Sequence, residues 1–162
     1  MTKKIKLLIV DDEIKFLDSI AKRLEMRGFY VKKATNGQEA INAARDNKYH
    51  LALLDFKMPG MNGRQVLEVF KKEHKFLEVI ILTGHGSLDS SVDCTKLGAF
   101  NYLPKPYEFE KLLEVLKQAY ETRLKKKFES DKKRMEKLTQ LATGSSPLSI
   151  LRKMRELDDD EK

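Results

Sequence analysis

Residues 5–12 read Ile-Lys-Leu-Leu-Ile-Val-Asp-Asp, a short apolar run that ends abruptly on two carboxylates. Four more runs of this kind follow within the first 122 residues. Their length and their β-branched or aromatic content are typical of strands that are buried on both faces of a sheet. The sequence therefore predicts five strands, at residues 5–10, 29–34, 51–54, 79–82 and 100–103.

Apolar residues at helical spacing fill the stretches between these runs. In the first stretch Leu17, Ile20 and Leu24 share one helix face, and Gly28 follows as a typical helix end. Similar spacing appears at residues 38–45, 66–70 and 92–97, and again from Phe109 onward. Five strands that alternate with five helices predict an α/β fold, in which right-handed crossovers build a parallel sheet with helices on both faces.

Polar residues stand at or just after the ends of these runs, namely Asp11, Asp12, Asp55, Thr83 and Lys105. Because the carboxyl ends of parallel strands meet at one edge of the sheet, we expect these side chains to converge. Carboxylates gathered at one place repel each other unless a cation lies among them, and Mg²⁺ prefers such oxygen ligands. The Thr83 hydroxyl and the Lys105 ammonium are donors suited to an anion with tetrahedral oxygens. The pattern predicts a pocket that holds Mg²⁺ beside a phosphoryl group.

Each of these residues also has a simpler interpretation. Asp11 and Asp12 are of a type that caps helices, Thr83 is an ordinary strand-end hydroxyl, and Lys105 is an ordinary exposed charge. Two capping carboxylates would not need Asp55 at the neighbouring strand end. The joint occurrence of all five residues favours the pocket.

Four motifs occur in order at these strand ends. They are Val10-Asp11-Asp12-Glu13, Leu54-Asp55 followed by Met58-Pro59-Gly60-Met61-Asn62-Gly63, Leu82-Thr83-Gly84, and Tyr102-Leu103-Pro104-Lys105-Pro106. In this combination the sequence resembles the receiver domain of bacterial two-component response regulators over about residues 3–122. The resemblance implies a flavodoxin-like, five-stranded parallel sheet with the order 2-1-3-4-5.

The resemblance also implies a role for each residue of the pocket. Asp55 would accept a phosphoryl group from a phosphohistidine on a sensor histidine kinase or phosphotransfer protein. Thr83 and Lys105 would contact phosphoryl oxygens, and the Lys105-Pro106 peptide would be cis. Mg²⁺ would be held by Asp11, Asp12, Asp55 and the backbone carbonyl of Lys57. Such a protein is a signalling phosphoacceptor with slow self-catalysed phosphoryl transfer and dephosphorylation, and not an enzyme.

Three further residues each keep two interpretations. Tyr102 is either a switch aromatic that turns inward as Thr83 moves toward the phosphate, or a plain half-buried aromatic. The Lys57 side chain either screens the phosphoryl group from water or points into solvent. His85 either positions a hydrolytic water or is simply exposed.

The segment after residue 122 begins as a continuation of the last helix, with no Gly or Pro before Gly144. We expect residues 123–143 to form a basic linker helix and residues 144–162 a short helix with an acidic, disordered end. Spacings of 4 and 3 along the linker form a heptad seam, interrupted by one Asp, that predicts a coiled coil and a homodimer. The alternative is an amphipathic tail that frays or folds back. The seam consists of Leu124, Phe128, Asp131, Met135, Leu138 and Ala142.

The stretch Gly144-Ser145-Ser146-Pro147-Leu148 resembles the opening of the AAA+ domain of bacterial enhancer-binding activators. In those proteins a receiver, a coiled linker helix and such a segment come in this order. Nothing after residue 122 resembles a complete effector domain, so we predict a stand-alone response regulator of a two-component phosphorelay, which signals through dimerisation or protein binding. The alternatives are a phosphorelay intermediate or phosphate sink, and a nucleic-acid-binding regulator that uses the basic tail.

The composition limits the remaining function classes. The chain has 162 residues and a formal charge of +7. Residues 1–122 hold 20 basic and 17 acidic side chains, and residues 123–162 hold 12 and 8. Such a basic block is more often a solvated helix face than a nucleic-acid contact, so we expect no nucleic-acid partner while keeping that alternative. The single Cys94 excludes an internal disulfide. No apolar stretch approaches the ~20 residues of a membrane span, so we expect a cytoplasmic protein without a membrane partner.

Overall fold

A five-stranded parallel sheet forms the centre of the computed structural model, which describes residues 3–84, 95–142, 148, 151, 152 and 155. The strands lie in the order β2-β1-β3-β4-β5, as predicted. All four neighbouring pairs are parallel. The strands are β1 (Lys6–Val10), β2 (Tyr30–Ala34), β3 (Leu51–Leu54), β4 (Glu78–Thr83) and β5 (Asn101–Pro104).

Within the described residues, these helices alternate with the strands: α1 (Ile14–Met26), α2 (Gly37–Asp46), α3 (Gly63–Glu73) and α5 (Phe109–Ala142). Capping residues explain where α2 and α3 start, since the side chains of Asn36 and Asn62 accept hydrogen bonds from backbone N–H groups in the first turns of these two helices. Gly28 adopts a φ of 94° just after α1, which a residue with a side chain rarely does. The helix expected at residues 92–97 lies mostly outside the described residues.

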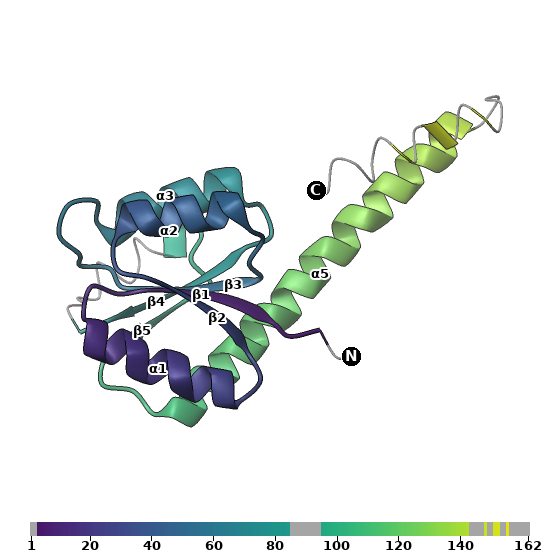
Figure 1. The fold of residues 1–162 in the computed structure, drawn as a ribbon. Coiled ribbons are helices and arrows are strands. Elements are labelled where there is room, and N and C mark those ends of the chain that lie inside the picture. The colour runs from purple at the N-terminus through teal and green to yellow at the C-terminus, as the bar shows by residue number, and fades with distance from the viewer. Residues whose placement is uncertain (1–2, 85–94, 143–147, 149–150, 153–154, 156–162) are drawn as a thin grey trace. The chain divides into compact units, whose positions relative to one another are not determined.

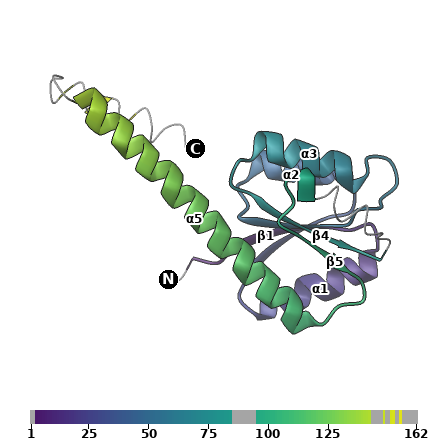
Figure 2. The same cartoon turned by 180° about the vertical axis from the view of Figure 1, so that it is seen from behind.

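The helices form two layers, one on each face of the sheet. Helices α2 and α3 cover one face, while α1 and the first part of α5 cover the other (Figures 1 and 2). Strand β1 contributes side chains to the cores on both faces of the sheet. Leu8 and Val10 belong to the core under α2 and α3, and Leu7 and Ile9 belong to the core under α1 and α5. An apolar run without alternation is thus what a strand between two helical layers requires.

The expectation that all five strands are buried on both faces is wrong for the two edge strands, β2 and β5. In β5 only Leu103 is buried, and β2 is more exposed still. Tyr30 is 52% exposed, and Lys32 and Lys33 are exposed as well, whereas all four residues of β3 are buried. The reason is position, because β2 lies at the edge of the sheet and pairs only with β1. The lysines of β2 also discourage pairing with another chain along this open edge.

The chain divides into two compact units, Met1–Arg123 and Leu124–Lys162. In the first unit, α5 buries Leu112, Leu116 and Ala119 against the sheet. In the second unit, Leu124, Phe128 and Met135 of α5 are exposed. Among the described residues, no helix is both long enough and apolar enough to cross a membrane.

Candidate functional site

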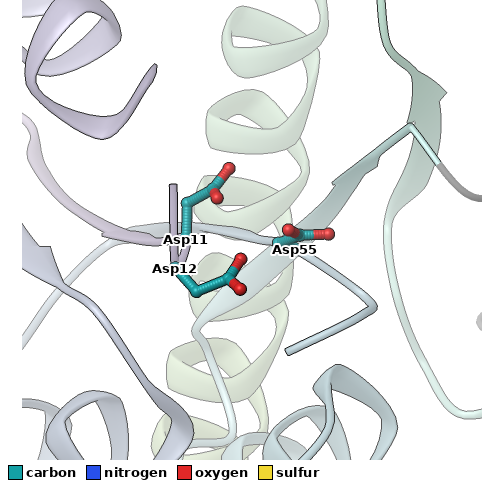
Figure 3. A group of neighbouring side chains, drawn as sticks. All are labelled: Asp11, Asp12 and Asp55. Atoms are coloured by element: carbon teal, nitrogen blue, oxygen red, sulfur yellow. The ribbon is translucent and has the colours of Figure 1, made fainter. Parts of the chain in front are cut away.

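Three aspartates meet at the carboxyl edge of the sheet. Asp11 and Asp12 follow the last residue of β1, Val10, which pairs in register with Leu54, the last residue of β3. Asp55 therefore emerges beside them (Figure 3). Carboxylate oxygens of Asp11, Asp12 and Asp55 lie within 4.8 Å of one another. Asp11 and Asp55 are buried and Asp12 is exposed, so the cluster opens to solvent on the Asp12 side.

Both carboxylate oxygens of Asp11 are engaged. The ammonium of Lys105 donates a hydrogen bond to Oδ2 at 2.7 Å, and the backbone N–H of Glu13 donates to Oδ1 at 2.9 Å. A buried carboxylate requires such partners, because burial without them would strongly disfavour its charged form. The N-cap residue of α1 is Glu13, and no side chain caps the helix, so the simpler interpretation of Asp11 and Asp12 as helix caps is wrong. Asp11 instead holds the backbone of Glu13 and joins Lys105 to the acidic cluster.

Lys105 is drawn into the site from the end of β5. Its side chain is only 15% exposed, which rules out the interpretation as an ordinary exposed charge. The ammonium lies 3.9 Å from the centre of the Phe16 ring, a cation–π contact. Phe16 in turn meets the edge of Tyr107 at 6.4 Å between ring centres. The predicted cis peptide between Lys105 and Pro106 is present.

Phe16 is a residue of the site that the strand-end motifs did not predict. Burial of its neighbour Tyr107 raises the pKa of the Tyr107 hydroxyl to about 12, because a phenolate is disfavoured away from water. An aromatic residue on the first turn after a pair of strand-end aspartates was the available signal. Aromatic residues on a predicted core face are too common for that signal to have been decisive.

The loop after Asp55 is held close to the acidic cluster. The backbone N–H of Lys57 donates to Oδ1 of Asp55 at 3.3 Å, while the Lys57 side chain is exposed. Gly63, the first residue of α3, has no room for a side chain, since an added Cβ would lie 2.5 Å from the Asp55 carbonyl oxygen. The motif therefore needs glycine here, so that α3 can start directly against the backbone of Asp55.

An open pocket of about 490 Å³ lies next to the cluster, on the loop that follows Asp55. None of the three aspartates lines it. The pocket is lined by the loop itself, on the side where the exposed Lys57 lies. The lining residues are Phe56, Lys57, Met58, Pro59 and Asn62.

Two further predicted residues, Thr83 and Tyr102, lie on the strands β4 and β5. Thr83 ends β4 and pairs in register with Pro104, so it stands beside the residue that precedes Lys105. Its side chain and the whole of His85 lie outside the described residues. Tyr102 is half-buried on β5 and packs against the core cluster under α2 and α3. Its role as a switch stays a prediction.

The donor set of the cluster fits a hard divalent cation. All three side chains offer carboxylate oxygen, which is the ligand type of Mg²⁺, and no histidine or cysteine takes part in the cluster. One side of the cluster stays accessible through the exposed Asp12, which suits an ion that keeps several of its waters. The residues present are therefore able to hold Mg²⁺.

Comparison with known proteins gives the class of protein that this fold and this site define. Residues 7–117 match the family described as the response regulator receiver domain. A CheY-like receiver domain protein from Methanospirillum hungatei has a similar structure, with a TM-score of 0.74 and 34% identity over 76% of this chain and 99% of that one. The chain belongs to the response regulator receiver domain family of two-component signalling proteins.

More particular similarities connect the chain to the NtrX and NtrC regulators. A putative NtrX-like response regulator of Rickettsia felis is 34% identical over 88% of this chain and 31% of its own length. NtrX from Brucella abortus, solved with ADP, has a TM-score of 0.76 and 29% identity over 86% of this chain and 33% of that one. The DNA-binding transcriptional regulator NtrC of Escherichia coli is 33% identical over 68% of this chain. These matches confirm the predicted resemblance to receivers of enhancer-binding activators.

The chain spans about a third of the length of the NtrX-like relatives that it matches. The matching relatives are therefore larger proteins that carry further regions. The prediction that this regulator stands alone stays a prediction.

Proposed function

We propose that Asp55 is the phosphoacceptor of a two-component phosphorelay, and that it takes its phosphoryl group from a phosphohistidine on a sensor histidine kinase or phosphotransfer protein. The observation that carries this proposal is the convergence of three carboxylates and one ammonium at the carboxyl edge of the sheet. In this reading the chain is a signalling phosphoacceptor, and its slow transfer and dephosphorylation reactions act on itself.

The transfer step needs only a positioned nucleophile. A carboxylate oxygen of Asp55 attacks phosphorus, the new O–P bond forms, and the P–N bond to the imidazole breaks. The electron pair of that bond remains on the imidazole nitrogen, and the proton on the other ring nitrogen of the phosphohistidine makes the leaving imidazole neutral. No base is required, because a carboxylate nucleophile has no proton to lose. Catalysis then consists of positioning and of neutralising charge on the phosphoryl oxygens.

The neighbouring residues supply this neutralisation. Bound Mg²⁺, held by Asp11, Asp12, Asp55 and the Lys57 carbonyl, would offset the negative charge of the acceptor and the phosphoryl group. Lys105 already reaches the cluster through Asp11, so its ammonium is close enough to pair with a phosphoryl oxygen. Thr83 stands at the end of the neighbouring strand, where its hydroxyl would serve as a further donor.

The signal is proposed to leave the receiver by a change in its contacts with another protein chain. Phosphorylation would shift the receiver between two states at the surface near β5 and α5, as expected for a bistable element. The contact is either a homodimer or a complex with a different protein. The second unit, which begins at Leu124, is the natural place for this contact, because Leu124, Phe128 and Met135 are exposed there.

Intact-mass analysis after incubation with acetyl phosphate and Mg²⁺ tests the acceptor. We expect one added phosphoryl group on the wild-type chain and none on Asp55→Asn. Asp46→Asn is the matched control, because Asp46 is an exposed aspartate at the end of α2, away from the cluster. Chelation of the divalent cation should abolish the uptake. Equal phosphorylation of wild type and Asp55→Asn would overturn the assignment.

A further inference from the structure

The helix α5 presents an exposed apolar stripe within the second unit. Leu124 is 50% exposed, Phe128 67% and Met135 54%, which is unusual for three large apolar side chains on one helix. Their spacings of 4 and 7 residues place them on one helix face. We call these residues the Leu124–Met135 stripe. A stripe of this length and periodicity is typical of a helix that pairs with another helix.

The charges that border the stripe all have the same sign. In the heptad that the stripe defines, Leu124 and Asp131 occupy position d, and Phe128 and Met135 occupy position a. The flanking e and g positions decide which helix can pair with such a seam. Between Leu124 and Met135 these flanking positions hold Lys125, Lys127, Lys132 and Arg134.

A second copy of this chain is therefore a poor occupant. In a parallel pair, Lys127 of one helix would face Lys132 of the other, and the two copies of Asp131 would meet inside the seam. In an antiparallel pair, each border would still face a border of the same positive sign. Like charges at these positions are a device that natural coiled coils use against self-pairing.

An anionic membrane surface is a poor occupant as well. Basic residues beside an apolar stripe suit such a surface in general. Here, however, the exposed Asp131 lies in the middle of the stripe, between Phe128 and Met135. A carboxylate at that place would have to enter the apolar layer or remain next to anionic headgroups, and both are unfavourable.

We propose that the Leu124–Met135 stripe docks an acidic amphipathic helix of another protein. Such a helix would place apolar residues against Leu124, Phe128 and Met135, and carboxylates against the lysines at the borders. A single basic residue opposite Asp131 would complete the match and fix the register. This proposal concerns the partner of the second unit and does not depend on phosphorylation of Asp55.

Two synthetic peptides of about three heptads test the charge rule. Both carry leucine at a and d with one lysine opposite Asp131, but the first has glutamate at e and g and the second has lysine there. Fluorescence anisotropy with the full, unphosphorylated chain should show binding of the acidic peptide at least about tenfold tighter than of the basic one. Added salt should reduce the difference in affinity between the two peptides, because it screens the charges.

Charge-reversal variants connect the binding to the border positions. Lys127→Glu combined with Lys132→Glu should weaken acidic-peptide binding by about tenfold or more. Lys126→Glu combined with Lys133→Glu makes the same change of net charge on the opposite helix face, and should leave binding within about threefold. Lys126, Lys132 and Lys133 are exposed and Lys127 is partly exposed on α5, so circular dichroism should show that each double variant keeps most of its helicity.

Sedimentation velocity and vesicle flotation separate the other occupants. A wild-type dimer that is lost on Phe128→Ser would identify a second copy as the occupant and overturn the proposal. Binding to phosphatidylserine-containing vesicles without binding to the acidic peptide would identify a membrane surface and would also overturn it. Equal affinity for both peptides, or for neither, would contradict the charge rule itself. Phosphorylation of Asp55 is measured separately, so a failure here leaves the acceptor assignment intact.

Discussion

The two halves of α5 carry apolar stripes of the same period, yet only one of them is covered. In the first half Leu112, Leu116 and Ala119 are at most 1% exposed, because the sheet lies against them. In the second half Leu124, Phe128 and Met135 are at least half exposed. The comparison shows that helical periodicity identifies a face without identifying what covers it. It also shows which half is a part of the fold and which is available to a partner.

The largest difference between the halves should appear in the free energy of unfolding. Leu112→Ala removes a fully buried side chain and leaves a cavity, so we expect a loss of about 2–5 kcal/mol. Met135→Ala should change stability by no more than about 0.5 kcal/mol, because its side chain is already exposed. Urea denaturation followed by circular dichroism measures both. A comparable loss in the two variants would mean that the second stripe is covered in solution.

A second prediction concerns the tight packing in the first unit. Gly63→Ala would place a Cβ 2.5 Å from the Asp55 carbonyl oxygen and 2.6 Å from the Phe56 Cα, so backbone must move. We expect a loss of about 1–3 kcal/mol, together with slower phosphorylation of Asp55 by acetyl phosphate. Gly84→Ala is the control for stability, since its added Cβ would make only an ordinary contact at 3.9 Å. Equal stability of the two variants would show that α3 is free to shift.

The junction between the halves gives a smaller effect. The guanidinium of Arg123, the last residue of the first unit, donates a hydrogen bond to the Phe76 carbonyl at 2.6 Å. Its partial burial also lowers the pKa of the guanidinium. Arg123→Ala should cost about 1.5 kcal/mol, the lower end for a hydrogen bond from a charged donor. Lys125→Ala, two residues further along, should cost almost nothing. A loss in the free energy of unfolding for Arg123→Ala but not for Lys125→Ala would show that α5 is packed against the first unit as far as Arg123 and no further.

The smallest effect is a pH dependence that belongs to the first unit alone, since all three histidines precede residue 123. Burial lowers the pKa of His74 from its usual 6.5, although Glu73 opposes this effect. Below that pH the unfolded chain binds more protons at this site than the folded chain, so stability falls as pH falls. His74→Gln should remove part of this fall between about pH 7.5 and about pH 5.5. If the free energy of unfolding changes with pH equally in the wild type and the variant, His74 does not contribute to the pH dependence.

Much of the fold and of the acidic cluster was predictable because those features depend on local patterns. The apolar runs predicted all five strands, and the aspartates at their ends predicted the cluster. The exposure of β2 was not predicted, because it depends on which strand lies at the sheet edge. The contact of Phe16 with Lys105 and the close approach of Gly63 to Asp55 were missed for a related reason. Each of these contacts brings together two different segments of the chain, and the spacing of apolar residues within one segment does not show how close it lies to another.

The sequence by itself determined the strand and helix pattern, the convergence of Asp11, Asp12 and Asp55, and the heptad spacing of the last helix. These follow from local periodicity and from the rule that parallel strands end at one edge. Only the tertiary structure decided that Lys105 pairs with Asp11, that Gly63 must lack a side chain, and that the stripe of α5 is covered before Arg123 and exposed after Leu124. The physical reason is that burial and pairing are properties of neighbours in space, which a single segment of sequence does not contain.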